Sequence, residues 1–256
     1  MGNRSLWQKI RGRYQRNAAR YLFRRPLAIK SKYPLVSFTF DDFPRSALRT
    51  GGAILQRNGL AATYYASLGL MGKESDTGTM FVPEDLELLL QQGHELGSHT
   101  YGHCDAWETN PREFQRSILK NQDALRQLVP TARFRTLSYP VSQPRVDTKR
   151  RAGNLYVCCR GGGQTFNVGT ADLSCALAFF LEQSRDCPQA VRETIEQNRE
   201  ARGWLIFATH DVSDSPTPWG VTPAFFAQVL DWVIASGARI VPVAEAIGEL
   251  RSAALG

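Results

Sequence analysis

Short apolar runs alternate with amphipathic segments from Pro34 onward, and this alternation limits the fold more than any other feature of the chain. The predicted strands are residues 34–40, 60–67, 94–98, 133–139, 154–159, 204–209 and 239–243. The predicted helices are residues 44–57, 82–92, 111–128, 188–202, 223–236 and a last one after 243. Repeated strand–helix units place parallel strands inside and helices outside. The sequence therefore predicts an α/β fold, either a barrel or a doubly wound sheet.

The positive charge of the chain is concentrated in its first part. The formal net charge is +7, yet residues 1–32 contain ten Lys or Arg and no acidic residue. The remaining residues, 33–256, therefore have 21 basic and 24 acidic side chains and are mildly acidic. We expect two parts, a basic N-terminal segment at 1–32 and a catalytic domain at 33–256.

An apolar stripe in the basic segment predicts an amphipathic helix. Its members recur at spacings of three or four and are Trp7, Ile10, Tyr14, Ala18 and Tyr21. Such a helix suits an anionic membrane surface. Packing of the stripe on the domain or on a second subunit stays open, and nucleic-acid binding is disfavoured because only charge supports it.

The same segment lacks the apolar stretch of a secretory signal, and no run approaches the ~20 apolar residues of a membrane span. The five cysteines are odd in number, and Cys158 and Cys159 are neighbours, which does not indicate a disulfide framework. We therefore expect a cytoplasmic protein, peripheral on the inner membrane face if the amphipathic helix binds lipid.

Two adjacent carboxylates, Asp41 and Asp42, follow the first strand. Catalytic groups of α/β barrels lie at the carboxyl ends of strands. Adjacent carboxylates repel each other unless a cation or hydrogen-bond donors compensate. One could bind a metal while the other stays free as a base. The alternative is a solvated turn before the next helix.

Histidines supply the further ligands of such a site. His99 and His103 are four residues apart, which on a helical turn would direct both imidazoles to one ion. Asp42, His99 and His103 would leave an open coordination position for chemistry. Late in the chain, His210 and Asp211 follow another strand, where the histidine could protonate a leaving amine. A structural role for each histidine is the alternative.

These segments together resemble the polysaccharide deacetylase family, the NodB-homology family or carbohydrate esterase family four. The segments that match the family motifs are Thr39-Phe40-Asp41-Asp42, His99-Thr100-Tyr101-Gly102-His103 and Ala208-Thr209-His210-Asp211. They occur in family order and span nearly the whole domain. The resemblance implies a distorted barrel of about seven strand–helix units, with Asp41 as catalytic base and His210 as acid.

The chain departs from the family pattern in several places, among them Thr209 where the last motif has leucine. Phe43 stands where the first motif usually has glycine. The third motif, commonly Arg-Pro-Pro-Tyr-Gly, is replaced by a region containing Tyr139 and Pro140. By resemblance these two would shape the acetyl site, with a backbone N–H near Tyr139 helping to bind the oxyanion. The candidates for orienting roles are Arg135 or Arg160 at Asp41, and Asp172 or Asp211 at His210.

The resemblance implies metal-dependent hydrolysis of the N-acetyl group of an amino sugar, in a polysaccharide or a lipid-linked precursor. Zinc is the expected ion for Asp42, His99 and His103, with cobalt, nickel and manganese as alternatives. A deformylase or other amidohydrolase on the same scaffold is a second interpretation. A non-catalytic, metal-binding adaptor is the third.

Overall fold

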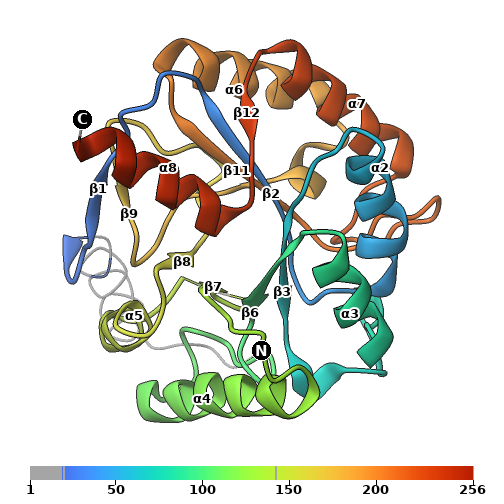
Figure 1. Ribbon diagram of the computed structural model, residues 1–256, viewed down its shortest axis with the longest axis vertical. Helices are drawn as coiled ribbons and strands as arrows, with labels where there is room; N and C mark the ends of the chain where they lie inside the picture. The colour runs from blue at the N-terminus through green and yellow to red at the C-terminus, as the bar shows by residue number, and fades with distance from the viewer. Residues whose placement is uncertain (1–18, 20, 142, 256) are drawn as a thin grey trace, which may run out of the picture.

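The strand–helix alternation folds as a curled parallel sheet in the computed structural model, which describes residues 19, 21–141 and 143–255. The eight-stranded sheet runs in the order β10 (Phe179–Phe180), β11 (Trp204–Thr209), β2 (Leu35–Phe40), β3 (Thr63–Ala66), β6 (Glu95–Ser98), β7 (Thr136–Ser138) and β8 (Cys158–Arg160), with β12 (Arg239–Ile240) paired to β2. Figure 1 shows the sheet curving inside a ring of helices. The predicted distorted barrel is confirmed.

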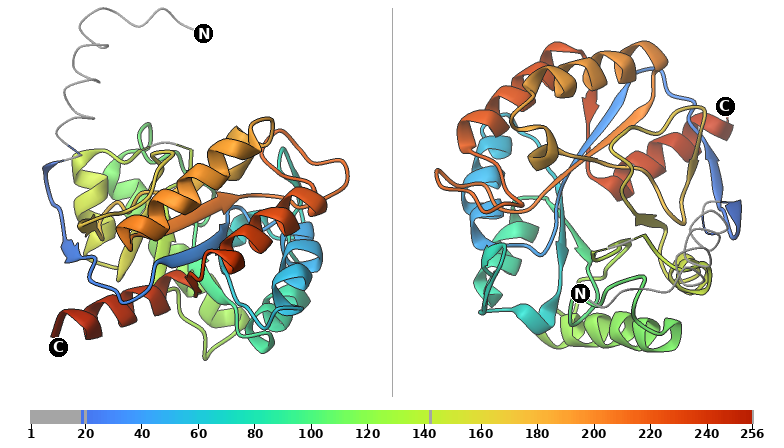
Figure 2. Two further views of the ribbon diagram at one scale, coloured as in Figure 1. Left: turned by 90° about the horizontal axis from the view of Figure 1, so that it is seen from above. Right: turned by 180° about the vertical axis from the view of Figure 1, so that it is seen from behind.

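Helices cover the outer side of this sheet, as the other directions in Figure 2 also show. They are a π-helical turn, η1 (Ala47–Gly52), continued by α2 (Ala53–Gln56), then α3 (Pro83–Gln91), α4 (Pro111–Leu128), α5 (Val146–Gly153), α6 (Pro188–Ala201), α7 (Pro223–Ala235) and α8 (Val243–Leu255). Proline opens α3, α4, α6 and α7, where its missing N–H costs nothing. In the part of the chain that the structure describes, no helix is both long and apolar enough to cross a membrane.

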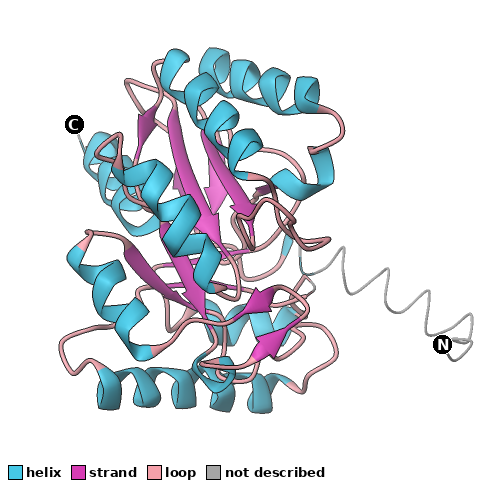
Figure 3. Ribbon diagram, turned by 90° about the vertical axis from the view of Figure 1, so that its right-hand side faces the viewer, coloured by secondary structure: helices cyan, strands magenta, loops and turns pink. Residues whose placement is uncertain are grey.

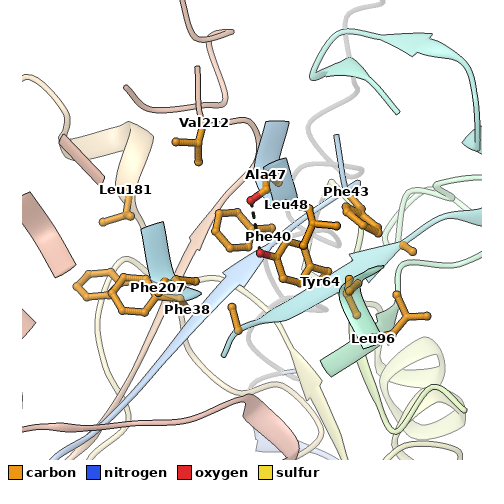
Figure 4. Close-up of a cluster of buried hydrophobic side chains, with 14 of the residues drawn as sticks. Phe38, Phe40, Phe43, Ala47, Leu48, Tyr64, Leu96, Leu181, Phe207 and Val212 are labelled. Carbon is orange, nitrogen blue, oxygen red and sulfur yellow. Dashed lines mark hydrogen bonds between the residues drawn. The ribbon is translucent and has the colours of Figure 1, made fainter. Parts of the chain in front are cut away.

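Buried apolar side chains form the core between the strands and the helices, whose arrangement is seen from the side in Figure 3. Every residue of β2 and of β11 is buried, as expected for parallel strands covered on both faces. The Phe38 and Phe207 rings are 5.5 Å apart, and Phe40 and Tyr64 are 4.8 Å apart. Figure 4 shows Phe38 beside Phe207 and Phe40 beside Tyr64. The packed aromatic layer fixes where the carboxyl ends of β2, β3 and β11 lie.

The described part of the N-terminal segment is joined to the domain. Strand β1 (Pro26–Ala28) pairs antiparallel with β9 (Thr170–Asp172). The buried Lys149 ammonium donates to the Ala19 carbonyl at 2.7 Å. The predicted amphipathic helix, and with it Trp7, Ile10, Tyr14 and Ala18, lies outside the described residues.

Candidate metal and catalytic site

The paired carboxylates leave the end of β2 through a turn with unusual backbone angles. Asp42 and Phe43 have φ values of 61° and 63°, in the left-handed region that favours glycine. Phe43 is fully buried and its ring stacks on Phe81 at 4.8 Å. The apolar contact compensates for the missing glycine, so the turn that separates the two carboxylates is kept with a different residue.

Asp42 is brought together with both histidines of the predicted ligand set. Its Oδ1 lies 3.5 Å from His99 Nε2 and 3.2 Å from His103 Nε2. One ligand atom from each of the three residues lies within 4.8 Å of the others. Asp42 Oδ1 is buried and has no hydrogen-bond partner among the described residues. A carboxylate oxygen left unpartnered between two imidazoles fits a divalent ion, because desolvating it without compensation is costly.

Hydrogen bonds hold two of these groups in the orientation that binding requires. His99 Nδ1 faces the Ser138 carbonyl at 2.9 Å, so Nδ1 carries the proton and Nε2 is left as acceptor. Burial lowers the pKa of His99 to about 4, which keeps the ring neutral at pH 7. Thr77, in the turn between β4 (Glu74–Ser75) and β5 (Gly78–Thr79), donates to Asp42 Oδ2 at 3.0 Å.

The two histidines do not share a helical turn, and that part of the prediction is wrong. Residues 99–103 form a loop after β6, with Thr100 and His103 at φ values of 61° and 51°. The Thr100 hydroxyl accepts from the Cys104 N–H at 2.9 Å and so closes the loop. The two left-handed residues turn the chain back on itself and bring the imidazole centroids to 5.0 Å.

The second carboxylate, Asp41, faces a different partner. Its Oδ2 accepts a short hydrogen bond from the guanidinium of Arg160, at the end of β8. Burial alone would raise the pKa of Asp41, but the positive charge of Arg160 holds it below its usual range. Oδ1 is buried and has no partner in the described part of the chain. Asp41 is therefore an ionised carboxylate with one oxygen free to accept a proton.

Of the two candidate arginines, the structure brings Arg160 to the site and leaves Arg135 away from it. Arg135 precedes β7 at the opposite end of the sheet, is exposed, and interacts electrostatically with Glu95. Arg160 is 1% exposed and is held by the Gly161 carbonyl at 2.8 Å and by the Ser138 hydroxyl. A guanidinium fixed on several sides keeps the carboxylate it binds in one orientation.

His210 lies at the carboxyl end of β11 and is partly exposed. Its Nδ1 is 3.1 Å from the Trp219 carbonyl. A carbonyl can only accept a hydrogen bond, so Nδ1 carries a proton. Nε2 is then the ring nitrogen that remains available for proton transfer. This contact replaces the expected carboxylate. Asp211 instead accepts the Thr217 N–H at 3.0 Å, and Asp172 pairs with Lys149 at 2.6 Å. Neither acid holds His210, which corrects both expectations.

Tyr139 lies at the predicted place, but its donors are occupied. Its N–H donates to the Arg160 carbonyl at 3.0 Å as part of the β7–β8 pairing, and its hydroxyl donates to Ser174 O at 3.0 Å. The Tyr139 N–H is therefore not available for an oxyanion, and the expected contact from a backbone N–H near Tyr139 stays a prediction. Pro140 is buried beside it, and its carbonyl accepts the Ala106 N–H at 3.2 Å.

Sequence reasoning missed Thr77, Ser138 and Glu182. Glu182 lies in the first turn of the short 3₁₀ helix η3 (Leu181–Ser184), is 9% exposed, and has an Oε2 without a partner among the residues described. Burial raises its pKa to about 8, and the charge of Asp41 acts in the same direction. None of these residues stands in a recognisable motif. Only their spatial position near the paired carboxylates or their partners distinguishes them.

The sequence of this chain matches a known protein family. The family model described as polysaccharide deacetylase matches residues 28–157, half of the chain. The chain belongs to the polysaccharide deacetylase family. Three further positions of the site, Arg160, Glu182 and His210, lie beyond the matched residues.

Curated relatives of this chain are distant. A chitooligosaccharide deacetylase of Sinorhizobium fredii is 28% identical over 108 residues, covering 42% of this chain and 46% of the relative. A chitin deacetylase of Arthroderma benhamiae is 24% identical over 221 residues, covering 84% of this chain and 52% of the relative. The chain thus spans about half the length of these relatives.

Solved structures show the same fold. The chitin deacetylase of Colletotrichum lindemuthianum superimposes with a TM-score of 0.62 at 18% identity, covering 87% of this chain and 90% of that one. A pseudoenzyme of carbohydrate esterase family four from Bacillus anthracis gives a TM-score of 0.60 at 11% identity, covering 85% and 66%. The fold therefore accompanies both active and inactive members, and activity has to be argued from the site.

Proposed function

We propose that this deacetylase hydrolyses the N-acetyl group of an amino sugar with the help of a divalent metal. One observation carries the proposal: the adjacent carboxylates have separate partners. Asp42 lies between two imidazoles, whereas Asp41 is bound by Arg160 and keeps one oxygen free. A metal ligand and an independent base at one strand end are the parts that metal-assisted amide hydrolysis requires.

Asp42, His99 and His103 would hold the ion, zinc being the expected one for this ligand set. Bound there, it would supply Lewis-acid activation of the amide carbonyl. Thr77 and the Ser138 carbonyl keep Asp42 and His99 in place by the hydrogen bonds they make. Such outer partners normally tune ligand orientation.

Asp41 acts as the base in this proposal. Its free Oδ1 accepts a proton from the water that attacks the acetyl carbon, while Arg160 keeps the carboxylate ionised and oriented. His210 acts as the acid. In this step His210 starts with a proton on both ring nitrogens: the Nε2 proton goes to the sugar nitrogen as the C–N bond breaks, and the Nδ1–H stays on the Trp219 carbonyl. The proton taken up by Asp41 is then released to solvent, and His210 takes one up again. The products are acetate and a free amino sugar.

The curated relatives support a sugar substrate, because their names place the activity on chitin oligomers, on chitin and, in Listeria monocytogenes, on peptidoglycan N-acetylglucosamine. The test is acetate release from N-acetylglucosamine oligomers and from lipid-linked amino sugars, with and without a chelator. Formate release from N-formyl analogues would instead favour the deformylase interpretation. Binding of metal without any turnover would favour the adaptor.

Asp41→Asn separates the roles of the two carboxylates. It should abolish acetate release but keep the metal, because Asp42 and both histidines remain. Asp123→Asn is a matched control, since its side chain is 64% exposed on α4. If Asp41→Asn loses the metal while Asp42→Asn keeps it, the assignment of base and ligand is reversed.

We also propose that the basic segment, residues 1–30, attaches the enzyme to an anionic membrane surface, where lipid-linked sugar precursors would be accessible. At its described end, Tyr21, Leu22 and Phe23 are exposed. Each basic residue near such a surface contributes roughly 1 kcal/mol. Sedimentation with anionic vesicles should be strong at low salt and weak at high salt. Unchanged sedimentation after deletion of residues 1–18 would place the attachment elsewhere.

A further inference from the structure

The loop between β11 and α7 presents an exposed indole next to His210. Trp219 is 50% exposed, although tryptophan is on average one of the more buried residue types. Its ring centroid lies 6.3 Å from that of His210, at an angle of 56°. In Figure 1 this loop is the orange segment that reaches out beside α2. A large, half-exposed aromatic side chain, that of Trp219, therefore lies next to His210, the candidate acid.

The exposure of Trp219 does not come from a loosely built loop. The buried Asp211 carboxylate accepts the Thr217 N–H at 3.0 Å, and the Asp211 carbonyl accepts the Val221 N–H at 3.0 Å. Gly220 is required for this closure, since a Cβ there would lie 2.0 Å from Asp211 Oδ1. The loop is thus tied at both ends, and the residue between the ties points its indole outward.

The backbone of the same residue belongs to the site. The Trp219 carbonyl accepts the His210 N–H at 3.3 Å and faces His210 Nδ1 at 3.1 Å. Main chain and side chain therefore have separable contacts. The main-chain carbonyl fixes the orientation of the imidazole, while half of the surface of Trp219 remains exposed to solvent.

We propose that the Trp219 indole is a stacking platform for a pyranose ring of the substrate, which places the acetamido group between Asp41 and His210. This inference rests on the proposed function. A pyranose has an apolar C–H face and a polar rim, and the half-exposed indole of Trp219 offers an apolar surface on which the C–H face can stack. Tryptophan has only two side-chain torsions, so ordering it on a ligand costs little entropy.

The binding test uses the full-length, zinc-loaded Asp41→Asn chain, which should keep the metal without turnover, with tri-N-acetylchitotriose as the probe; the variants for calorimetry are made in this background. Trp219→Ala should weaken binding, measured by calorimetry, by about five- to thirtyfold, the effect typical of a truncated aromatic anchor. Trp219→Phe keeps an aromatic face and should lose less. Tyr33→Ala is the matched control, because Tyr33 is also 50% exposed but precedes β2 at the opposite end of the sheet. It should bind as the wild type does.

A second readout separates substrate contact from an effect on His210. The ratio of kcat/KM for the trimer to kcat/KM for 4-nitrophenyl acetate should fall in Trp219→Ala, mainly through KM for the trimer. Equal losses on both substrates would mean that the indole acts through the imidazole, and would overturn the proposal. So would wild-type affinity in Trp219→Ala. Trimer binding without hydrolysis, weakened in Trp219→Ala, would refute the proposed function but support the platform.

Discussion

Replacing Arg160 with methionine should destabilise the protein strongly, because the change leaves a buried carboxylate without its counter-charge. Arg160 is 1% exposed and Asp41 is 4% exposed. Methionine retains much of the side-chain volume but none of the donors. Removing one partner of a buried ion pair costs ~3–5 kcal/mol, so we expect the free energy of unfolding to fall by about 4 kcal/mol.

A double-mutant cycle in urea measures how much of that loss is due to the pair. Asp41→Asn removes the charge that Arg160→Met would leave unpaired, so the double variant should recover a coupling free energy of about 2 kcal/mol. The exposed pair Arg126 and Asp123, whose side chains are 60% and 64% exposed, is the control. Its coupling should be below about 0.5 kcal/mol. Additive losses for Arg160 and Asp41 would refute the argument.

The pH dependence of the cycle has a defined sign. The pKa of Asp41 in the folded protein lies below its ordinary value of 3.8. Its contribution to stability is therefore present above pH 3.8 and is lost as the pH falls through the folded pKa. With a chelator present, the difference between wild type and Arg160→Met should be constant from about pH 6 to 7. It should shrink on acidification.

Three further outcomes are expected. His210→Ala should lower kcat by ~10²–10⁴-fold with unchanged metal content, and a near-normal kcat would make this residue structural. His99→Ala should lose most of the bound ion in metal analysis, whereas retention of one ion per chain would contradict the ligand set. Burial raises the pKa of Glu182 from 4.5 to about 8, so the wild type loses stability as pH rises between these values. Glu182→Gln should remove that loss, and identical urea midpoints for both proteins at about pH 9 would disprove it.

Elements with local signals were predicted almost to the residue. Helix α4 begins at Pro111, after Asn110, whose side chain accepts the Arg112 N–H at 2.9 Å. Strand β11 follows Gly203, which has no room for a side chain because a Cβ there would lie 2.8 Å from the Asn167 carbonyl. In each case the residue that sets the start of the element directly precedes it in the sequence. Local chemistry therefore sets these bounds.

Strand β1 and the π-helical form of the predicted helix at residues 44–57 depend on distant partners and were not predicted. Strand β1 exists because Pro26–Ala28 pairs with Thr170–Asp172, and the same pairing connects the basic segment to the domain. In the π-helical turn Ala47–Gly52, Gly51 packs closely on two distant residues. A Cβ added at Gly51 would lie 3.0 Å from the Phe40 ring and 3.0 Å from the Val212 side chain. Neither the pairing of β1 with β9 nor the packing of Gly51 can be read from the secondary-structure propensities of the local sequence. Tertiary packing decides both.

The site divides in the same way. Asp41, Asp42, His99 and His103 occur in short patterns at strand ends, and parallel strands bring such ends to one edge of the sheet. The partner of Asp41 could not be chosen from sequence, since Arg160 is 119 residues away. The choice between Arg135 and Arg160 depends on which end of its strand each arginine occupies. That is settled by strand bounds, which sequence patterns predict least reliably.

The position of Arg160 shows what is kept when the third motif of the family changes. Ser138 and Arg160 are paired in the register of β7 and β8, and parallel neighbours lie about 4.8 Å apart. The Arg160 side chain is long enough to pass its neighbour on β7: its guanidinium donates both to the small hydroxyl of Ser138 and to Asp41, which follows β2. A bulkier residue at 138 would occupy the path. The requirement is therefore a guanidinium at the base, and the strand that supplies it can differ as long as its neighbour leaves room.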